Sequence, residues 1–159
     1  MIDLPVMQFP VEKLINTARA SRERAYAPYS GFRVGAAILT SEGRVYTGCN
    51  IENASYGLTV CAERVALFKA VSNGERQFAA LAVISDSEDY CTPCGACRQV
   101  LAEFGSEVKV YMCNHHGEYI VKTLAELLPL SFKLKGGEDG KIEDSPRPNP
   151  VRVVEPVDR

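Results

Sequence analysis

Hydrophobic positions along the chain change between helical and strand-like spacing. From Val11 to about Glu23, apolar residues recur three or four positions apart, which predicts an amphipathic helix that ends at the turn sequence APYSG. The runs FRVGAAILT (32–40) and RVYTGCNI (44–51) flank the short sequence SEG and therefore predict a β-hairpin. A second helix is predicted from Cys61 to about Val71, and the sequence SNG closes it.

The second half of the chain predicts three more strands and two more helices. AALAVIS (79–85) is short and almost wholly apolar, as in a central strand that is covered on both faces. Pro93 fits the first turn of a helix that Gly105 ends, and EVKVYMC (107–113) and EYIVKT (118–123) are strands around the turn NHHG. LAELLP (124–129) is a short closing helix. Helices that alternate with strands predict a layered α/β domain with a mixed sheet.

Composition changes near residue 135, and this predicts two parts of the chain. Residues 1–134 form the expected folded domain, whereas 135–159 are rich in glycine, proline and charge and form an expected C-terminal tail. The whole chain of 159 residues has 46% hydrophobic and 24% charged residues, which is typical of a globular protein.

Charge and targeting signals restrict the possible partners and compartment. A net charge of −2 offers no electrostatic attraction for nucleic acid. The N-terminal sequence lacks the pattern of a secretory signal, and no window approaches the roughly 18 apolar residues of a membrane span. Six cysteines in such a chain indicate thiols or metal ligands rather than disulfides, and the cytoplasm is the expected compartment.

Three cysteines have the spacing of metal ligands. Cys94 and Cys97 are three residues apart, so they share a face of the predicted helix, and Cys61 lies at the start of another helix. Backbone N–H groups at helix starts favour thiolate, and three protein ligands plus water are common for catalytic zinc. Cys91 lies two positions before Pro93 and belongs to the preceding loop, because proline disfavours helical geometry at the residue before it.

The other cysteines and the histidines have ordinary interpretations. Cys91, Cys49 and Cys113 are interpreted as small hydrophobic residues. His115 and His116 are the only histidines and lie in the predicted turn NHHG, where no metal partner stands at a matching spacing. They are interpreted as an exposed hairpin tip.

Glu63 favours catalysis over a purely structural metal site. Residues two apart do not face each other on a regular helix, so Cys61 must lie at the helix edge if both are to reach one pocket. A hydrolytic zinc site needs such a carboxylate, which takes a proton from water and delivers it to the leaving group. Three thiolates leave a divalent ion with net negative charge, and a hydrogen bond from Arg64 to a thiolate would withdraw part of it.

The combined motifs resemble the small homotetrameric cytidine deaminases. The resemblance rests on CAE (61–63) and PCGAC (93–97), and extends through YSGFRVGAA (29–37), GCNIENASYGLTVCAERVALFKAV (48–71), TPCGACRQVLAEFG (92–105) and ELLPLSF (126–132). It implies a three-layer αβα sandwich around a mixed five-stranded sheet. It also implies hydrolytic deamination of cytidine and deoxycytidine for pyrimidine salvage, with one Zn²⁺ per subunit.

The same resemblance implies a role for individual residues. Cys61, Cys94 and Cys97 match the zinc ligands, and Glu63 matches the proton carrier. The expected substrate contacts are the ring of Phe32, the side chains of Asn50 and Glu52 at the ribose hydroxyls, the backbone of Ala62 at the pyrimidine edge, and Phe132 from a neighbouring subunit. Tyr56 matches a tyrosine near the subunit contacts.

Four alternatives remain at this level. A deaminase of single-stranded nucleic acid would need a basic groove with stacking aromatics, which this slightly acidic chain without tryptophan does not predict. A deaminase of a nucleoside-like antibiotic would share the scaffold. A structural zinc module for protein binding leaves Glu63, Asn50 and Glu52 unexplained, and a dithiol redox protein leaves Cys61 without a role.

Overall fold

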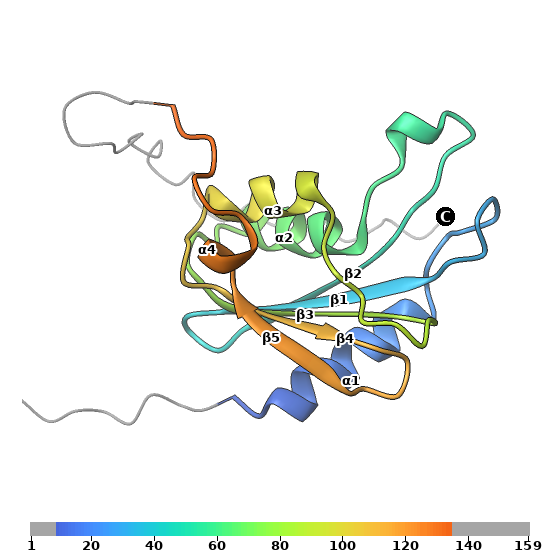
Figure 1. The fold of residues 1–159 in the computed structure, drawn as a ribbon, viewed down its shortest axis with the longest axis horizontal. Coiled ribbons are helices and arrows are strands. Elements are labelled where there is room, and N and C mark those ends of the chain that lie inside the picture. The colour runs from blue at the N-terminus through green and yellow to red at the C-terminus, as the bar shows by residue number, and fades with distance from the viewer. Residues whose placement is uncertain (1–8, 135–159) are drawn as a thin grey trace, which may run out of the picture.

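A mixed five-stranded sheet lies at the centre of the computed structural model, which describes residues 9–134 (Figure 1). No helix within this range is long and apolar enough to cross a membrane. The elements along the chain are α1 (Val11–Arg22), β1 (Val34–Thr40), β2 (Val45–Cys49), η1 (Tyr56–Leu58), α2 (Ala62–Ser72), β3 (Phe78–Ser85), α3 (Gly95–Ala102), β4 (Lys109–Cys113), β5 (Tyr119–Thr123) and α4 (Leu124–Leu127).

The strand order is β2-β1-β3-β4-β5, and only the β3–β4 pair is parallel. β1 and β2 form the predicted hairpin, with Ala37 opposite Thr47. β3 occupies the centre of the sheet and is buried along nearly its whole length, as its apolar sequence predicts. The parallel pair places the carboxyl ends of β3 and β4 side by side, with Ile84 opposite Cys113.

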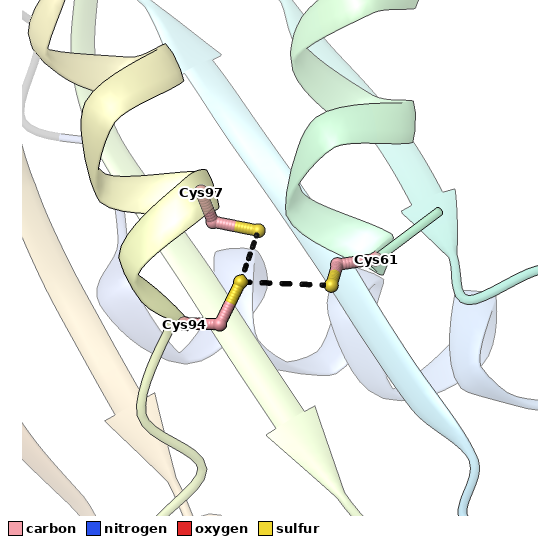
Figure 2. A group of neighbouring side chains, drawn as sticks. All are labelled: Cys61, Cys94 and Cys97. Atoms are coloured by element: carbon pink, nitrogen blue, oxygen red, sulfur yellow. Dashed lines mark hydrogen bonds between the residues drawn. The ribbon is translucent and has the colours of Figure 1, made fainter. Parts of the chain in front are cut away.

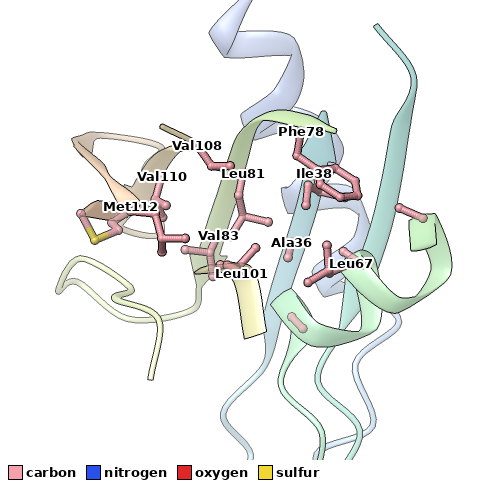
Figure 3. Packing of buried hydrophobic residues seen from close by; sticks show 14 of the residues in the cluster. Ala36, Ile38, Leu67, Phe78, Leu81, Val83, Leu101, Val108, Val110 and Met112 are labelled. Carbon is pink, nitrogen blue, oxygen red and sulfur yellow. The ribbon is translucent and has the colours of Figure 1, made fainter. Parts of the chain in front are cut away.

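Helices cover both faces of the sheet, and this confirms the predicted three-layer αβα sandwich. α1 packs on one face, whereas α2, α3 and α4 lie on the other (Figure 1). Side chains of β1 alternate between the two layers: Ala36 and Ile38 join the cluster beneath α2 and α3 (Figure 3), and Ala37 and Leu39 join the cluster beneath α1.

A glycine in β2 allows α2 to approach the sheet closely. A Cβ atom on Gly48 would lie 2.3 Å from the carbonyl oxygen of Ala62 and 2.5 Å from the backbone nitrogen of Ala66. These distances are too short for any side chain, so only glycine permits this contact. The first turn of α2 is therefore held against β2, and the residues at its start are positioned by the sheet.

The start of α3 differs from its prediction. Pro93 was expected in the first helical turn, but the helix begins at Gly95, and Cys94 is the N-cap residue with extended backbone angles (φ −66°, ψ 167°). The prediction was wrong because the Pro93 carbonyl accepts a 2.8 Å hydrogen bond from the Arg98 Nε–H, and Arg98 is itself held by a 2.8 Å hydrogen bond from its Nη1–H to the Leu127 carbonyl of α4. The predicted tail, 135–159, lies outside the described residues, so the division at residue 134 stays a prediction.

Candidate metal centre and active site

Two helix starts bring three cysteine thiols together. Cys61 is the N-cap of α2, Cys94 is the N-cap of α3, and Cys97 lies in the first turn of α3 (Figure 2). The Sγ atoms of Cys61 and Cys94 are 3.8 Å apart, and those of Cys94 and Cys97 are 3.5 Å apart. All three sulfurs lie within 4.8 Å of one another and can hold one metal ion.

The sulfur separations fit tetrahedral coordination. Zinc–thiolate bonds of about 2.3 Å at tetrahedral angles place neighbouring sulfurs about 3.8 Å apart, close to the Cys61–Cys94 and Cys94–Cys97 separations. A trithiolate set also suits zinc as a ligand type and leaves one position for a water molecule. The residues present therefore fit a zinc ion with an open coordination site.

Neighbouring donors favour negative charge on the sulfurs. A hydrogen bond from the Cys97 thiol is the main cause that lowers the pKa of Cys61 to about 5, and Arg64 adds to this effect. The same pairing raises the pKa of Cys97. Arg64 Nη2 lies 3.4 Å from the Cys61 sulfur, and its Nε–H is buried without a hydrogen-bond partner among the described residues. The cost of burying this unpaired Arg64 N–H group is smallest when the adjacent sulfurs carry negative charge.

Glu63 directs a buried carboxyl group toward the thiols. Glu63 is only 4% exposed, and its Oε2 atom lies 3.7 Å from the Cys97 sulfur. Burial raises the pKa of Glu63 to about 7. Cys61 lies just before α2 and has extended backbone angles. Because it is not part of the regular helix, its side chain and that of Glu63 can reach the same pocket. A carboxyl group with such a pKa can both accept and donate a proton near neutral pH.

The remaining cysteines lie outside this group. Within residues 9–134, Cys49, Cys91 and Cys113 are free thiols and are not part of the metal cluster. Burial raises the pKa of Cys91 to about 12 and that of Cys113 to about 11, so both stay neutral thiols.

Asn50 organises the loop that carries Phe32. Asn50 is buried, its Nδ2 donates to the Phe32 carbonyl at 2.7 Å, and its Oδ1 accepts from the Val34 backbone N–H at 2.8 Å. The amide still has one N–H and one lone pair for another partner. Phe32 is 46% exposed as a residue, so it is available for a contact outside the protein core.

Glu52 is held by the same loop. Oε1 accepts from the backbone N–H groups of Tyr29 at 2.9 Å and Ser30 at 3.1 Å, and Oε2 accepts from the Ser30 hydroxyl at 2.6 Å. The hydroxyl bond is the main cause that lowers the pKa of Glu52. The carboxylate is thus ionised and fixed in orientation.

The other predicted contact residues lie around this region in different environments. Ala62 is buried as the first residue of α2, where the backbone N–H has no partner within the helix. Tyr56 is 73% exposed and its ring packs edge-on against Tyr29, with 5.7 Å between ring centroids. Phe132 is 69% exposed. The structure of one chain therefore leaves both aromatic side chains available to other molecules.

Sequence reasoning missed three positioning residues. Ser30 bonds to Glu52, and Arg98 links the Pro93 carbonyl to the Leu127 carbonyl with two 2.8 Å hydrogen bonds. Gln99 holds the backbone of Phe132 from both sides, through its Nε2 at 3.0 Å and its Oε1 at 3.3 Å. The pairs Ser30–Glu52, Arg98–Leu127 and Gln99–Phe132 lie 22, 29 and 33 positions apart, so local spacing carries no signal for them.

Together, a three-layer αβα domain, three converging thiols and a buried acid at the start of α2 define a metal-dependent hydrolase with sulfur ligands. The family model described as the cytidine and deoxycytidylate deaminase zinc-binding region matches residues 10–113. The chain belongs to this deaminase family. Its resemblance to cytidine deaminases, inferred from the motifs, is confirmed, and zinc is the metal of the matched region.

Relatives and solved structures agree with this assignment. A cytidine deaminase of Sporosarcina psychrophila is 55% identical over 77% of this chain and 90% of its own length. Another, from Halalkalibacterium halodurans, is 52% identical over 80% of this chain and 98% of its own. The crystal structure of cytidine deaminase from Burkholderia pseudomallei has a TM-score of 0.76 and 50% identity, and covers 78% of this chain and 100% of that one.

Proposed function

We propose that this chain is a zinc-dependent enzyme that converts cytidine and deoxycytidine to uridine and deoxyuridine, with release of ammonia, in pyrimidine salvage. The observation that carries the proposal is the buried Glu63 carboxyl group 3.7 Å from the sulfur of Cys97, inside the group of three thiols. A structural zinc module does not require the Glu63 carboxyl group, and a dithiol redox pair formed by Cys94 and Cys97 does not require the Cys61 sulfur.

Cys61, Cys94 and Cys97 would hold the zinc ion. When bound, zinc supplies Lewis-acid activation of water at neutral pH. Glu63 accepts a proton from the attacking water and delivers it to the ring N3, then takes the second proton from the new hydroxyl group on the ring carbon and delivers it to the departing amino group. A C–O bond forms at the ring carbon that bears the amino group. The bond from that carbon to the amino nitrogen then breaks, and ammonia leaves. Arg64 keeps negative charge on the Cys61 sulfur throughout, because its guanidinium lies beside that atom.

The loop of residues 29–34 and its two partners suit a nucleoside. Glu52 is ionised and can accept a hydrogen bond from a ribose hydroxyl, and the unused N–H and lone pair of Asn50 can serve a second one. The exposed ring of Phe32 suits the flat face of a pyrimidine, and the free N–H of Ala62 suits an acceptor on its edge. A site that pairs with sugar hydroxyls rejects analogues that lack them.

The exposed apolar surface supports assembly into a homotetramer. A shallow depression of about 490 Å³ includes Ile51, Leu58 and Phe68, which are 45%, 67% and 49% exposed. Such apolar patches commonly become subunit interfaces. Phe132 would then enter the substrate pocket of a neighbouring subunit, while Gln99 holds its backbone, and Tyr56 would contact a subunit. The enzyme would act in the cytoplasm on free nucleosides rather than on nucleic acid or at a membrane.

The decisive assay follows the fall in ultraviolet absorbance when the purified protein meets cytidine or deoxycytidine. We expect turnover of both, and a loss of at least about 10²-fold in kcat for Glu63→Gln, since general acid–base catalysis contributes on that scale. Glu12→Gln, an exposed position on α1, is the control and should keep full activity. Turnover of single-stranded DNA or of a nucleoside-like antibiotic in place of cytidine would contradict the proposal.

A further inference from the structure

A second group of metal-ligating side chains lies outside the thiol cluster. Glu88, His115 and His116 each offer a ligand atom, and these atoms all lie within 4.8 Å of one another. His115 Nε2 is 2.7 Å from Glu88 Oε1, and His116 Nε2 is 3.6 Å from Glu88 Oε2. The centroids of the two imidazole rings are 3.7 Å apart with the ring planes tilted by 41°, and the Nε2 atom of each ring lies near the Glu88 carboxylate.

Sheet topology explains why these residues meet. β3 and β4 are parallel neighbours, so their carboxyl ends reach the same edge of the sheet. Glu88 follows the end of β3 by three residues, and the histidines follow the end of β4 directly after Asn114. Crevices at the carboxyl ends of strands are common ligand sites in open α/β sheets.

The turn that carries the histidines is fixed by hydrogen bonds. The buried side chain of Asn114 accepts from the backbone N–H groups of His116 at 3.0 Å and Glu118 at 3.1 Å. The His115 backbone N–H donates to the Ser87 carbonyl at 2.9 Å, which ties the turn to the segment of Glu88. The ligand atoms are thus held near one another without a metal, and this lowers the entropic cost of binding one.

We propose that Glu88, His115 and His116 form a second binding site, for a borderline divalent ion such as Zn²⁺. Two imidazoles and one carboxylate are the donor set that zinc uses with three protein ligands, at about 2.0 to 2.2 Å each. Tetrahedral bonds of that length place the donor atoms about 3.4 Å apart, within the range of the separations present. Since the side chains of His116 and Glu88 are 59% and 81% exposed, water completes the coordination and the ion enters from solvent.

The ion would cross-link two segments next to the active site. One is the turn between β4 and β5, and the other is the connection from β3 to α3, which ends at Cys94. The hydrogen bond from the His115 backbone N–H to the Ser87 carbonyl already joins these two segments, and the Cys91 backbone N–H donates a 3.0 Å hydrogen bond to the Cys113 carbonyl at the end of β4. Binding at this site therefore stabilises the folded state and the connection that presents a catalytic zinc ligand.

The test uses untagged full-length protein that carries one equivalent of zinc. Titration calorimetry with further Zn²⁺, in a buffer that does not chelate metal, should reveal a second and weaker equivalent per chain. The double variant His115→Gln, His116→Gln should lose it, and Glu88→Gln should weaken it at least tenfold. Glu107→Gln, which neutralises an exposed carboxylate elsewhere, should retain it.

A second readout separates this site from the catalytic centre. Saturating Zn²⁺ should raise the Tm of the one-zinc protein but not that of the double variant. Deamination of cytidine should be unchanged in the double variant under one equivalent of zinc, because neither histidine belongs to the catalytic group. Absence of a second equivalent, or an equivalent that survives in the double variant, would overturn the proposal.

Discussion

Replacement of Gly48 by alanine tests how the sheet positions the start of α2. The added Cβ would lie 2.3 Å from the Ala62 carbonyl oxygen and 2.5 Å from the Ala66 nitrogen, and ordinary contact begins near 3.4 Å. Since 3.4 minus 2.3 is 1.1, α2 must move by about 1 Å. Both clashes are with backbone atoms, so no change of side-chain rotamer can relieve them. Overpacking of this kind costs about 1–3 kcal/mol or more.

The displacement should reach the thiol cluster, because Cys61 and Glu63 lie at the start of α2. For a chain of this size, the cost corresponds to a Tm lower by roughly 3 to 10 °C. Differential scanning calorimetry measures the Tm, and metal analysis after dialysis against a chelator measures zinc retention, which should also fall.

Gly95→Ala provides the matched control. A Cβ on Gly95 meets nothing within 4 Å, although this residue also lies at a helix start, directly after Cys94. The Tm of Gly95→Ala should not fall. If Gly48→Ala matched the wild-type Tm and zinc retention, the close approach of α2 to β2 would not be what positions the site.

Three further variants test separate parts of the site and fold. Cys97→Ala should reduce bound zinc well below one equivalent in metal analysis, whereas Cys91→Ala should retain it; the reverse result would reassign the ligand. Ser30→Ala removes the 2.6 Å bond to Glu52 and should raise KM for cytidine several-fold with little change in kcat; an unchanged KM would contradict that role. Hydrogen bonding from the Thr123 backbone N–H lowers the pKa of Glu126. The ionised carboxylate therefore stabilises the folded state above the pKa that Glu126 has in the unfolded chain, and this stabilisation is lost as the pH falls through the lower pKa of the folded state. Glu126→Gln should therefore reduce the Tm at neutral pH but not in acid well below about pH 4, and an equal reduction at both would exclude the charge as the cause.

Local patterns were enough to predict most of the fold. Strict apolar runs and turn sequences gave all five strands, and the burial of β3 follows from its unbroken hydrophobic sequence. Helical spacing and helix-start residues also placed Cys61, Cys94 and Cys97 at two helix starts. Such predictions succeed because they depend on neighbours within about one helical turn, which the sequence displays directly.

Contacts between distant segments could not be predicted in this way. Arg98 donates a hydrogen bond to the Leu127 carbonyl, 29 positions away, and the orientation of Glu52 is set by Ser30, 22 positions away. Glu88 and His115 lie 27 positions apart and meet only because β3 and β4 are parallel neighbours.

The sequence by itself therefore determined the elements, the ligand types and their places at helix starts. Tertiary structure alone decided that the three sulfurs lie within 4.8 Å of one another and that Glu63 is buried beside them. The physical reason is that strand order and helix packing set distances across the sheet, whereas sequence spacing sets distances only along one element. The pKa of Glu63, near 7, arises from burial, which no local pattern encodes.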